Sequence, residues 1–282
     1  FRVVIMRGEE EGLLGSLGML GQLTEDDLSR RMRSGSAGPT LRELLTGIGV
    51  DPAAVSSGKH CVDFAKIAAF IEVHIEQSAR LDNAVTDRVG VVTGIRGLIR
   101  HRTIQAIGET AHAGAVDFPY RKDAALACAR FSSRLYDFWQ HELSLGRDLV
   151  ATTGVIRTSP SASMNKIAGE CIVSLDARSL SAAELNLFEK KVEAILQETA
   201  EETGVIFKTD PLMRIAPVEA DEGVMKKLET SADILKIGTQ RMPSGAGHDA
   251  MNFAAAGACL AGAAAGCSVW GASGSASAGG FP

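Results

Sequence analysis

The stretch ECIVSLDARSLSAAELNLFEKKVEAILQETAEETGVIFK, residues 170–208, predicts a strand, a helix and a second strand in direct succession. Apolar and polar residues alternate over 170–177, which is the period of a half-buried strand. Residues 181–202 place apolar side chains at helical spacing. Ser181 as N-cap, with Glu184 three positions later, is the capping-box pattern of a helix start. The order of elements in this part of the chain therefore follows from local pattern.

Gly204 fits the C-terminal cap of this helix, and residues 205–208 predict the strand that follows. Upstream, the pattern predicts a strand, a helix and a strand over residues 98–107, 121–140 and 150–157. Strand-helix-strand-strand-helix-strand is the order of the ferredoxin-like, split βαβ unit. Residues 95–211 are therefore expected to form a compact inserted domain of the α+β type.

The inserted domain would interrupt a first domain made of residues 1–94 and 212–256. The elements expected in the first domain are a buried core strand at 1–6, helices at 41–48, 61–70 and 219–234, a short buried strand at 69–74, and a helix after Asp249. A core strand with nothing before it predicts that the chain lacks an upstream portion. Residues 257–282 consist mainly of Ala, Gly and Ser, and their composition predicts a flexible tail, with a tightly packed small-residue segment as the alternative.

Composition places the chain of 282 residues among ordinary globular proteins, with 45% hydrophobic residues. The net charge of −5 argues against a nucleic-acid partner, which requires clustered Lys and Arg. Every long apolar stretch is interrupted by charge or glycine, so no membrane span is expected. The five cysteines are odd in number, widely spaced and without a CxxC motif. They are expected to be reduced thiols of a cytoplasmic protein.

Three short segments carry side chains suited to a metal-bound water. They are EEEG at Glu9–Gly12, HIEQ at His74–Gln77 and SGAGHDA at Ser244–Ala250. Each joins a potential metal ligand to a neighbouring carboxylate or amide. A zinc-type hydrolytic site needs imidazole and carboxylate ligands, with a general base beside the water. The three segments together indicate a metallohydrolase.

Each of these segments also has an alternative that involves no catalysis. Glu9–Glu11 could be a solvated acidic turn, and His74 a hydrogen-bonded core residue. Gln77 offers an amide suited to a substrate carbonyl or ureido group. Asp249 could cap the following helix, or it could orient His248 as an outer partner of a metal site. The Gly-rich turn before His248 could also bind phosphate, although no GxGxxG motif or P-loop lysine accompanies it.

Three further polar residues lie in the predicted inserted domain. His112, in a turn rich in Gly and Ala, could donate a hydrogen bond to a developing oxyanion or simply be an exposed loop residue. Arg178 could pair with a substrate carboxylate, or form a salt bridge with Asp176 or Glu170. Asn165 could be a turn residue.

In their order, these segments and the strings between them resemble the M20-type amidohydrolases that include N-carbamoyl-L-amino acid, allantoate and ureidoglycolate hydrolases. The matching strings are EEG at 10–12, LGQLTEDDL at 20–28, HIEQ at 74–77, VTGIRG at 92–97, AHAG at 111–114, RKDA at 121–124, Asn165, DAR at 176–178 and SGAGHDA at 244–250. The resemblance covers residues 1–256.

The resemblance implies an α/β fold, with a metallopeptidase-like mixed-sheet catalytic domain and an inserted ferredoxin-like α+β lid and dimerisation domain. It implies two divalent metal ions, zinc or manganese, with Glu11, His74 and His248 as ligands. Glu10 would be the general base. The residues implied to hold the substrate or the oxyanion are Gln77, His112, Asn165 and Arg178. In such dimers a residue of the His112 type often serves the neighbouring subunit's site.

The implied reaction is hydrolysis of a linear amide or ureido C–N bond in a carboxylate-bearing substrate, with release of ammonia and carbon dioxide. The expected substrate is allantoate, ureidoglycolate or an N-carbamoyl-L-amino acid. The expected protein is a cytoplasmic homodimer that binds neither nucleic acid nor membrane. An aminoacylase or dipeptidase of the same family is one alternative. A non-catalytic dimerising binding protein that lacks the complete metal site is the other.

Several features depart from the family pattern. An upstream His and a bridging Asp, the first metal ligands of the family, have no counterpart, so the second ion would lack ligands from this chain. The usual Ser-Arg-Phe is absent after Gly12, and Ser78 stands where glycine is usual. The family's C-terminal Ser-His segment is not recognisable after Gly257. The chain is therefore expected to be incomplete at both ends.

Overall fold

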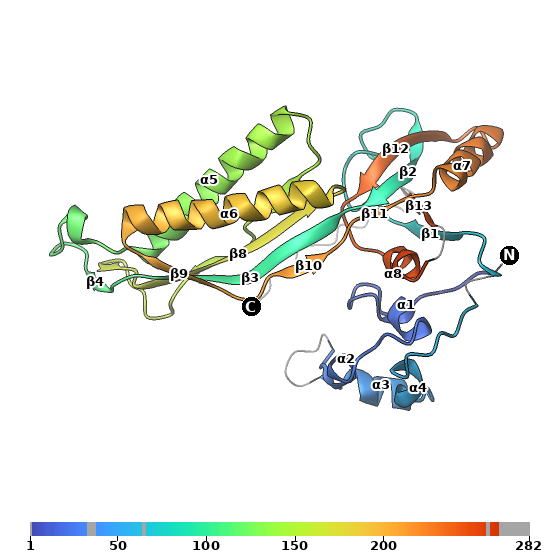
Figure 1. Ribbon diagram of the computed structural model, residues 1–282, viewed down its shortest axis with the longest axis horizontal. Coiled ribbons are helices and arrows are strands. Elements are labelled where there is room, and N and C mark those ends of the chain that lie inside the picture. The colour runs from blue at the N-terminus through green and yellow to red at the C-terminus, as the bar shows by residue number, and fades with distance from the viewer. Residues whose placement is uncertain (1, 33–37, 64–65, 258–259, 265–282) are drawn as a thin grey trace, which may run out of the picture. The chain divides into compact units, whose positions relative to one another are not determined.

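The computed structural model describes residues 2–32, 38–63, 66–257 and 260–264, which form two compact units (Figure 1). Unit 1 contains the described residues of Phe1–Thr93, Ala220–Met242 and Asn252–Pro282. Unit 2 contains Gly94–Glu219 and Pro243–Met251. Residues Pro243–Met251, which the sequence analysis assigned to the first domain, belong to unit 2 instead. No helix in the described ranges combines the length and apolar character needed to cross a membrane.

Unit 2 follows the order of strands and helices expected from the sequence. Its main elements are β3 (Gly97–Ile107), α5 (Ala124–Ser144), β5 (Val150–Thr152), β6 (Ile156–Thr158), β8 (Glu170–Ser179), α6 (Ala182–Thr203), β9 (Ile206–Thr209) and β10 (Met213–Ile215). Its shorter elements are β4 (Ala111–His112), the 3₁₀ helix η3 (Phe118–Tyr120), β7 (Lys166–Ile167) and β11 (Val218–Glu219). The single strand expected over 150–157 is divided into β5 and β6.

The sheet of unit 2 is built on the long antiparallel pair β3 and β8. Their register runs from Gly97 opposite Ser179 to Ile107 opposite Glu170. β9 and β10 pair with the other side of β3, and β5 and β6 pair with the other side of β8. Helices α5 and α6 lie side by side along this sheet (Figure 1).

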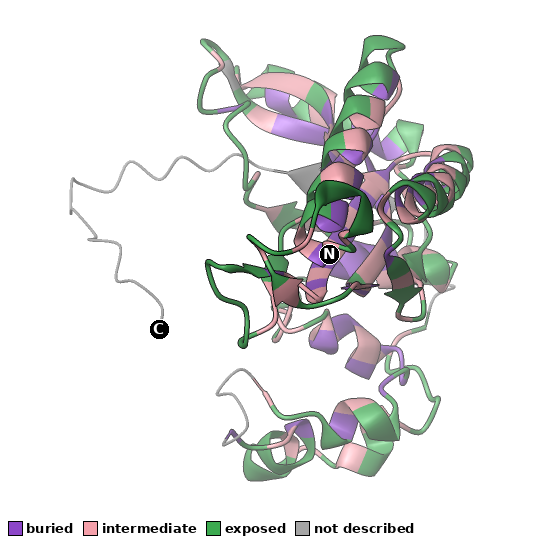
Figure 2. Ribbon diagram, turned by 90° about the vertical axis from the view of Figure 1, so that its left-hand side faces the viewer, coloured by how far each residue is buried: buried purple, intermediate pink, exposed green. Residues whose placement is uncertain are grey.

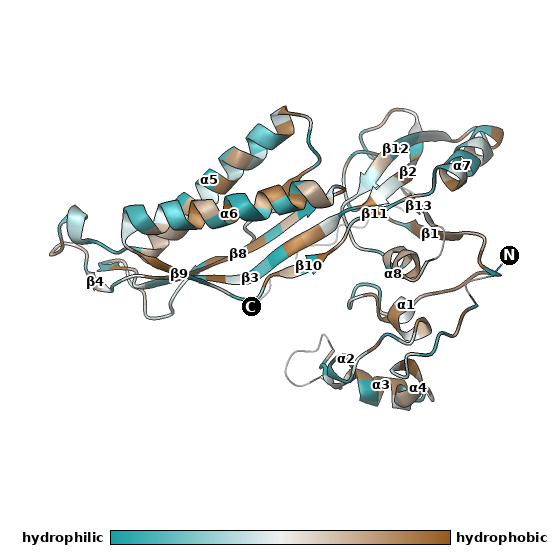
Figure 3. Ribbon diagram, viewed as in Figure 1, coloured by the Kyte–Doolittle hydropathy of each residue, from teal (hydrophilic) through white to brown (hydrophobic). Residues whose placement is uncertain are grey.

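The core of unit 2 lies between the two helices and the sheet. Burial alternates residue by residue along β8, as the period-2 pattern predicts. Phe131 of α5 and Phe188 of α6 are fully buried there with Ile104 and Val173 of the sheet. Figure 2 shows buried and exposed residues on opposite sides of the helices, and Figure 3 shows hydrophilic and hydrophobic residues sharing each helix. The apolar residues at helical spacing therefore form the side of each helix that packs against the sheet.

Helix α6 begins and ends where the sequence predicted. The Ser181 side chain accepts a hydrogen bond from the backbone N–H of Glu184 (3.2 Å), which satisfies a donor of the first turn. Gly204 at the other end has φ +64°, a left-handed conformation that glycine adopts without steric cost.

Unit 1 contains strands from both ends of the described sequence. β1 (Phe70–His74) runs parallel to β13 (Leu260–Ala264), which pairs antiparallel with β2 (Asp87–Ile95). Unit 1 also contains α7 (Glu222–Ile234), the first part of β12 (Gly238–Ser244), which pairs with β2, and the last part of α8 (Asp249–Ala255). The rings of Phe70 and Phe253 stack with their centroids 4.2 Å apart.

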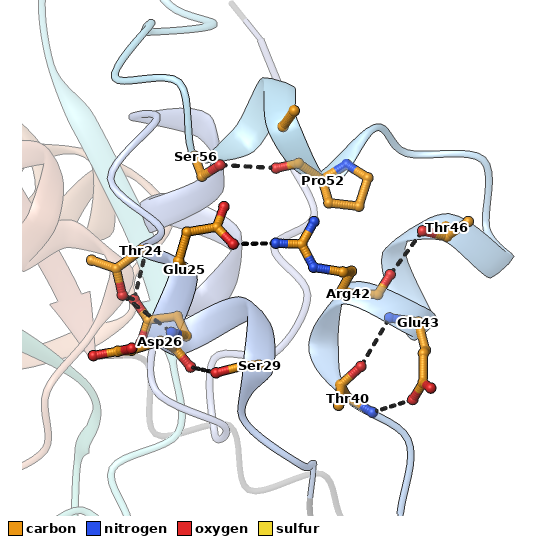
Figure 4. A network of polar contacts seen from close by, with 12 residues as sticks. Thr24, Glu25, Asp26, Ser29, Thr40, Arg42, Glu43, Thr46, Pro52 and Ser56 are labelled. Carbon is orange, nitrogen blue, oxygen red and sulfur yellow. Dashed lines mark hydrogen bonds and ion pairs between the residues drawn. The ribbon is translucent and has the colours of Figure 1, made fainter.

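The described residues before β1 form four short α-helices: α1 (Leu14–Met19), α2 (Glu25–Ser29), α3 (Leu41–Gly47) and α4 (Pro52–Val55). Thr24 and Thr40 each begin a helix with a complete capping box (Figure 4). Arg42 of α3 forms an ion pair with Glu25 of α2. The buried apolar cluster shared by α1, α2 and α3 consists of Leu14, Leu23, Leu28 and Leu41. Local capping therefore defines these helices more than a large core does.

Three expectations for unit 1 were wrong. Residues 2–6 form no strand, and Val3 and Ile5 are 74% and 89% exposed. The helix expected over 61–70 is absent from its described residues: the chain bends at 61–62, and Phe70 already belongs to β1. Within the segment 257–282, for which composition favoured a flexible tail over a packed small-residue segment, residues 260–264 form β13, and residues 258–259 and 265–282 lie outside the described residues. Strand formation depends on pairing with a distant segment, which an apolar or small-residue composition does not specify.

One difference of degree accompanies these corrections. β1 is present as expected, but its residues alternate in burial, and Val73 is 74% exposed. Cys61, Cys128 and Cys171 are free thiols, as expected for reduced cysteines. Cys259 and Cys267 lie outside the described residues.

Candidate active site

The acidic segment Glu9–Gly12 forms a tight turn in unit 1. The backbone N–H groups of Gly12 and Leu13 both donate to the Glu9 carbonyl, at 3.1 and 3.0 Å. Gly12 and Leu13 have φ values of +106° and +61°. Because the backbone reverses here, the three carboxylates leave it in different directions: Glu9 and Glu11 are half-buried and Glu10 is exposed. Leu13 pays a conformational cost that glycine would avoid, which is typical of functional turns.

His74, the last residue of β1, faces this turn. Its Nε2 lies 3.6 Å from Oε1 of Glu9, and the two side chains are 13% and 24% exposed. Its Nδ1 lies 2.6 Å from the carbonyl oxygen of Ile75. Because a carbonyl oxygen only accepts, Nδ1 donates the hydrogen bond. In the neutral imidazole the Nε2 lone pair and the Glu9 carboxylate can then bind one cation together, whereas in the imidazolium Nε2 would donate to Glu9 directly.

The donor set fits a divalent metal. Imidazole nitrogen and carboxylate oxygen are both ligands of zinc, and imidazole with its second nitrogen on a carbonyl has the usual orientation of a metal-bound histidine. Glu9, which the sequence left without a role, is the acidic residue that lies beside His74. Glu11 remains a predicted ligand, and its backbone carbonyl accepts from Arg30 at 2.5 Å. The string EEEG alone does not show which of its three carboxylates lies beside His74.

The chain turns sharply after β1. Gln77, predicted to contact substrate, is exposed and has φ +56°. The Glu76 carboxylate accepts from the backbone N–H groups of Arg80 (3.0 Å) and Leu81 (2.9 Å). Desolvation acts to raise the pKa of Glu76, but these bonds and one from Ser78 hold that pKa below its ordinary value. Glu76 therefore fixes the turn that carries Gln77.

His248 belongs to unit 2 and directly precedes α8. Its residue is 5% exposed, and its Nε2 lies 2.5 Å from the hydroxyl of Ser244. The same hydroxyl donates to the carbonyl of Ala246 at 3.3 Å. Asp249, fully buried, is the first residue of α8. The Gly-Ala-Gly turn thus carries a buried imidazole whose orientation is fixed by a serine.

Arg178 contacts both the sheet and this turn. Its Nε donates to Oδ1 of Asp176 (2.7 Å), and its Nη1 donates to the carbonyl of Gly245 (2.5 Å). Arg100 also donates to Asp176, with Nε 2.8 Å from Oδ2. Desolvation acts to raise the pKa of Asp176, but bonds from the two guanidinium groups hold that pKa below its ordinary value. The salt bridge to Asp176 weighed from the sequence is present.

His112 and Asn165 lie together on a separate two-stranded ladder. His112 of β4 pairs with Lys166 of β7, and the N–H of Ala113 donates to the Asn165 carbonyl at 2.9 Å. The N–H of Gly114 donates to Nδ1 of His112 at 3.1 Å, which leaves the ring proton on Nε2. Both His112 and Asn165 are exposed. An exposed imidazole N–H is suited to donating to an oxyanion.

Arg178 lies at one end of the unit 2 sheet, and His112 and Asn165 lie at the opposite end. Arg178 lies opposite Leu98 at the start of β3, whereas β4 follows Ile107 at its end (Figure 1). About ten residues of strand at 3.3–3.4 Å per residue separate them by roughly 30 Å. The predicted site residues His112 and Asn165 therefore cannot contact the same small molecule as Arg178 of the same chain.

The chain is similar in sequence to known hydrolases. Residues 2–277 match the family described as Peptidase family M20/M25/M40. The chain is 30% identical over 250 residues to the N-carbamoyl-L-amino-acid amidohydrolase of Paenarthrobacter aurescens, covering 87% of this chain and 59% of that protein. It is 31% identical over 250 residues to the allantoate amidohydrolase of Bacillus subtilis, covering 86% of this chain and 57% of that protein.

A solved structure is similar to this chain in fold. The crystal structure of AtUAH in complex with glyoxylate has a TM-score of 0.66 and 27% sequence identity, over 90% of this chain and 59% of that one. The chain thus spans a little over half the length of the relatives that it matches. Sequence and fold agree that it belongs to peptidase family M20/M25/M40, in the group of amidohydrolases that includes the N-carbamoyl-L-amino acid and allantoate hydrolases.

Proposed function

We propose that the protein is a metal-dependent hydrolase of a ureido or amide C–N bond in a small carboxylic acid. The observation that carries this proposal is the 3.6 Å approach of Glu9 Oε1 to His74 Nε2, with His74 Nδ1 committed to the Ile75 carbonyl. A metal bound through Nε2 requires the ring proton on Nδ1, and the bond from Nδ1 to the Ile75 carbonyl meets that requirement. Zinc and manganese are the ions that this donor set and the family favour.

A divalent ion bound at this centre would lower the pKa of the attacking water and polarise the carbonyl of the substrate. Glu10 is exposed on the same turn as Glu9, so it can take the proton of that water and deliver it to the leaving nitrogen. His248 is proposed as a further metal ligand, since it is buried and oriented by Ser244. Gln77 is proposed to contact the ureido group.

We assign His112 and Asn165 to the site of a neighbouring subunit. The roughly 30 Å of sheet between them and Arg178 excludes a shared role within one chain. Unit 2 would then be both the dimerisation domain and the lid. His112 Nε2–H would donate to the oxyanion that forms as water attacks, and Asn165 would hold the substrate beside it.

Arg178 is proposed to bind the substrate carboxylate. Three of its five N–H donors are directed at Asp176 and Gly245, and the others remain for a carboxylate. The relatives act on N-carbamoyl-L-amino acids and allantoate, and a relative's crystal structure contains glyoxylate. Allantoate, ureidoglycolate and N-carbamoyl-L-amino acids are therefore the proposed substrate class. Water adds to the carbonyl, the C–N bond breaks, and the carbamate formed decomposes to carbon dioxide and ammonia.

The test is ammonia release by the metal-stripped protein, with and without added Zn²⁺ or Mn²⁺, from allantoate, ureidoglycolate and several N-carbamoyl-L-amino acids. We expect metal-dependent ammonia release from at least one substrate, and its loss in Glu10→Gln. A protein that binds no metal and hydrolyses none of these compounds contradicts the proposal. That outcome would instead favour the non-catalytic binding protein that lacks the complete metal site.

A further inference from the structure

We infer that Ser244 and Arg178 are positioning residues that orient the His248 imidazole, one through its hydroxyl and the other through the carbonyl of Gly245. The role of His248 as a metal ligand rests on the function proposed above. The inference adds that the ring is set from the sheet of unit 2, by a chain of hydrogen bonds that starts at Asp176.

The turn before His248 is held at three points. The backbone N–H of Arg96 donates to the Ser244 carbonyl at 3.1 Å. Arg178 Nη1 donates to the Gly245 carbonyl at 2.5 Å. The Ser244 hydroxyl and His248 Nε2 are 2.5 Å apart. Ser244 and His248 are 9% and 5% exposed, so the bond between them competes little with water.

Arg178 can act as an anchor because its own guanidinium is fixed. Asp176 binds it through Nε at 2.7 Å and Nη2 at 3.3 Å, and Arg100 holds the same carboxylate from β3. A planar guanidinium held by a carboxylate through two nitrogens has little freedom to rotate. The third nitrogen, Nη1, therefore meets the Gly245 carbonyl in a defined direction. Lysine has no comparable fork and cannot make both contacts with the same geometry.

The Ser244 bond addresses the ring itself. A metal-bound histidine coordinates through one nitrogen, and a hydrogen bond at the other nitrogen fixes its tautomer and its rotation. Ser244 occupies this outer position at Nε2. Glycine and alanine at 245–247 add no long side chain that could hold the ring instead. The serine and the arginine thus control one degree of freedom each: rotation of the ring, and position of the backbone that bears it.

The experiment measures Zn²⁺ affinity of the metal-stripped protein without substrate, in Ser244→Ala, in Arg178→Lys and in the double variant. Loss of an outer partner typically weakens metal binding by about 10- to 100-fold, and we expect a loss of this size in each single variant. Because both act on one turn, the double variant should lose less than the product of the two. A purely substrate-binding Arg178 would leave Zn²⁺ affinity unchanged.

Ser132→Ala is the matched control. Ser132 has the same 9% exposure and lies in α5 of unit 2, and its hydroxyl has no hydrogen-bond partner in the part of the chain that the structure describes. We expect its Zn²⁺ affinity to equal that of the wild type.

A second readout requires no metal. The ¹⁵N chemical shift of His248 Nε2 should change in Ser244→Ala and stay constant in Ser132→Ala. Unchanged affinity and an unchanged Nε2 shift in Ser244→Ala would overturn the inference while leaving the hydrolase proposal intact. A wild-type protein that binds neither Zn²⁺ nor Mn²⁺ and hydrolyses none of the substrates would defeat the hydrolase proposal, and the Nε2 shift would still decide whether Ser244 orients His248.

Discussion

At the scale of single residues, the three adjacent carboxylates of the acidic turn are expected to differ in role. Glu9 lies 3.6 Å from His74, whereas Glu10 is exposed. We expect Glu9→Gln to weaken Zn²⁺ binding by more than the roughly 100-fold loss of an outer partner, because a direct ligand is removed. Glu10→Gln should bind Zn²⁺ almost normally and lose turnover. If Glu11→Gln abolishes Zn²⁺ binding and Glu9→Gln does not, the ligand is Glu11.

A second residue-scale prediction concerns acid stability. The pKa of Asp176 is held below its ordinary value by Arg178 and Arg100, against the opposing effect of burial. The folded state therefore binds this proton less readily than the unfolded state, whose pKa is about 3.9. The resulting stabilisation is present above that pH and is lost as the pH falls through the folded-state pKa.

Asp176→Asn should therefore lower the free energy of unfolding at pH 7 by about 1–3 kcal/mol, because two guanidinium groups lose a charged acceptor. The difference from the wild type should shrink below about pH 4. Urea unfolding between pH 7 and pH 3 measures it. A difference that is constant over this range would show that the carboxylate is not stabilised in its ionised form.

At the scale of elements, the end of α6 depends on one backbone conformation. Gly204 has φ +64°, and a Cβ there would also lie 3.4 Å from the Lys122 side chain. Gly204→Ala should cost about 1–2 kcal/mol of stability, because a left-handed backbone conformation is unfavourable for alanine. Gly154→Ala is the control, since its Cβ would meet only Thr152 at 3.9 Å, and it should change stability by less than about 0.5 kcal/mol. Equal thermal shifts in the two variants would contradict this account.

The elements that could be predicted from the sequence are those specified by local chemistry. Helix α6 has its periodicity, its Ser181 cap and its Gly204 end within one stretch, and all three were confirmed. Strand β13 could not be predicted, because its backbone bonds go to β1, nearly two hundred residues away in sequence. Residues 2–6 show the reverse case: they have the composition of a core strand without a paired strand in the described part of the chain.

The same division applies to the site. Motif order identified the segments of Glu9–Gly12 and His74 because each segment carries its own ligand chemistry. The choice of Glu9 as the neighbour of His74 depends on the left-handed residues Gly12 and Leu13, which place each carboxylate in space. The grouping of Arg178 with Gly245 depends on the packing of a turn against a distant strand.

At the scale of the whole molecule, the length of β3 and β8 predicts how complete active sites are assembled. His112 is roughly 30 Å from Arg178 within one chain, so a complete site would take His112 from a partner. His112→Ala and Glu10→Gln should each be inactive alone. When the two variants exchange subunits, each mixed dimer contains one site with an intact Glu10 and an intact His112. Its other site lacks both residues.

An equal mixture of the two variants should therefore regain about a quarter of wild-type activity, since about half of the dimers are mixed and each has one of two sites intact. The measurement is ammonia release after subunit exchange, with size-exclusion chromatography to verify dimers. Mixing Glu10→Gln with Glu9→Gln is the control: both changes fall on the same turn, so no site in a mixed dimer is complete and no activity should return. Restored activity in the first mixture alone would mean that His112 of one subunit acts in the active site of its partner. A first mixture that remains inactive, with mixed dimers demonstrated, would show that His112 and Glu10 act within one chain and would contradict the assignment of His112 to a partner's site.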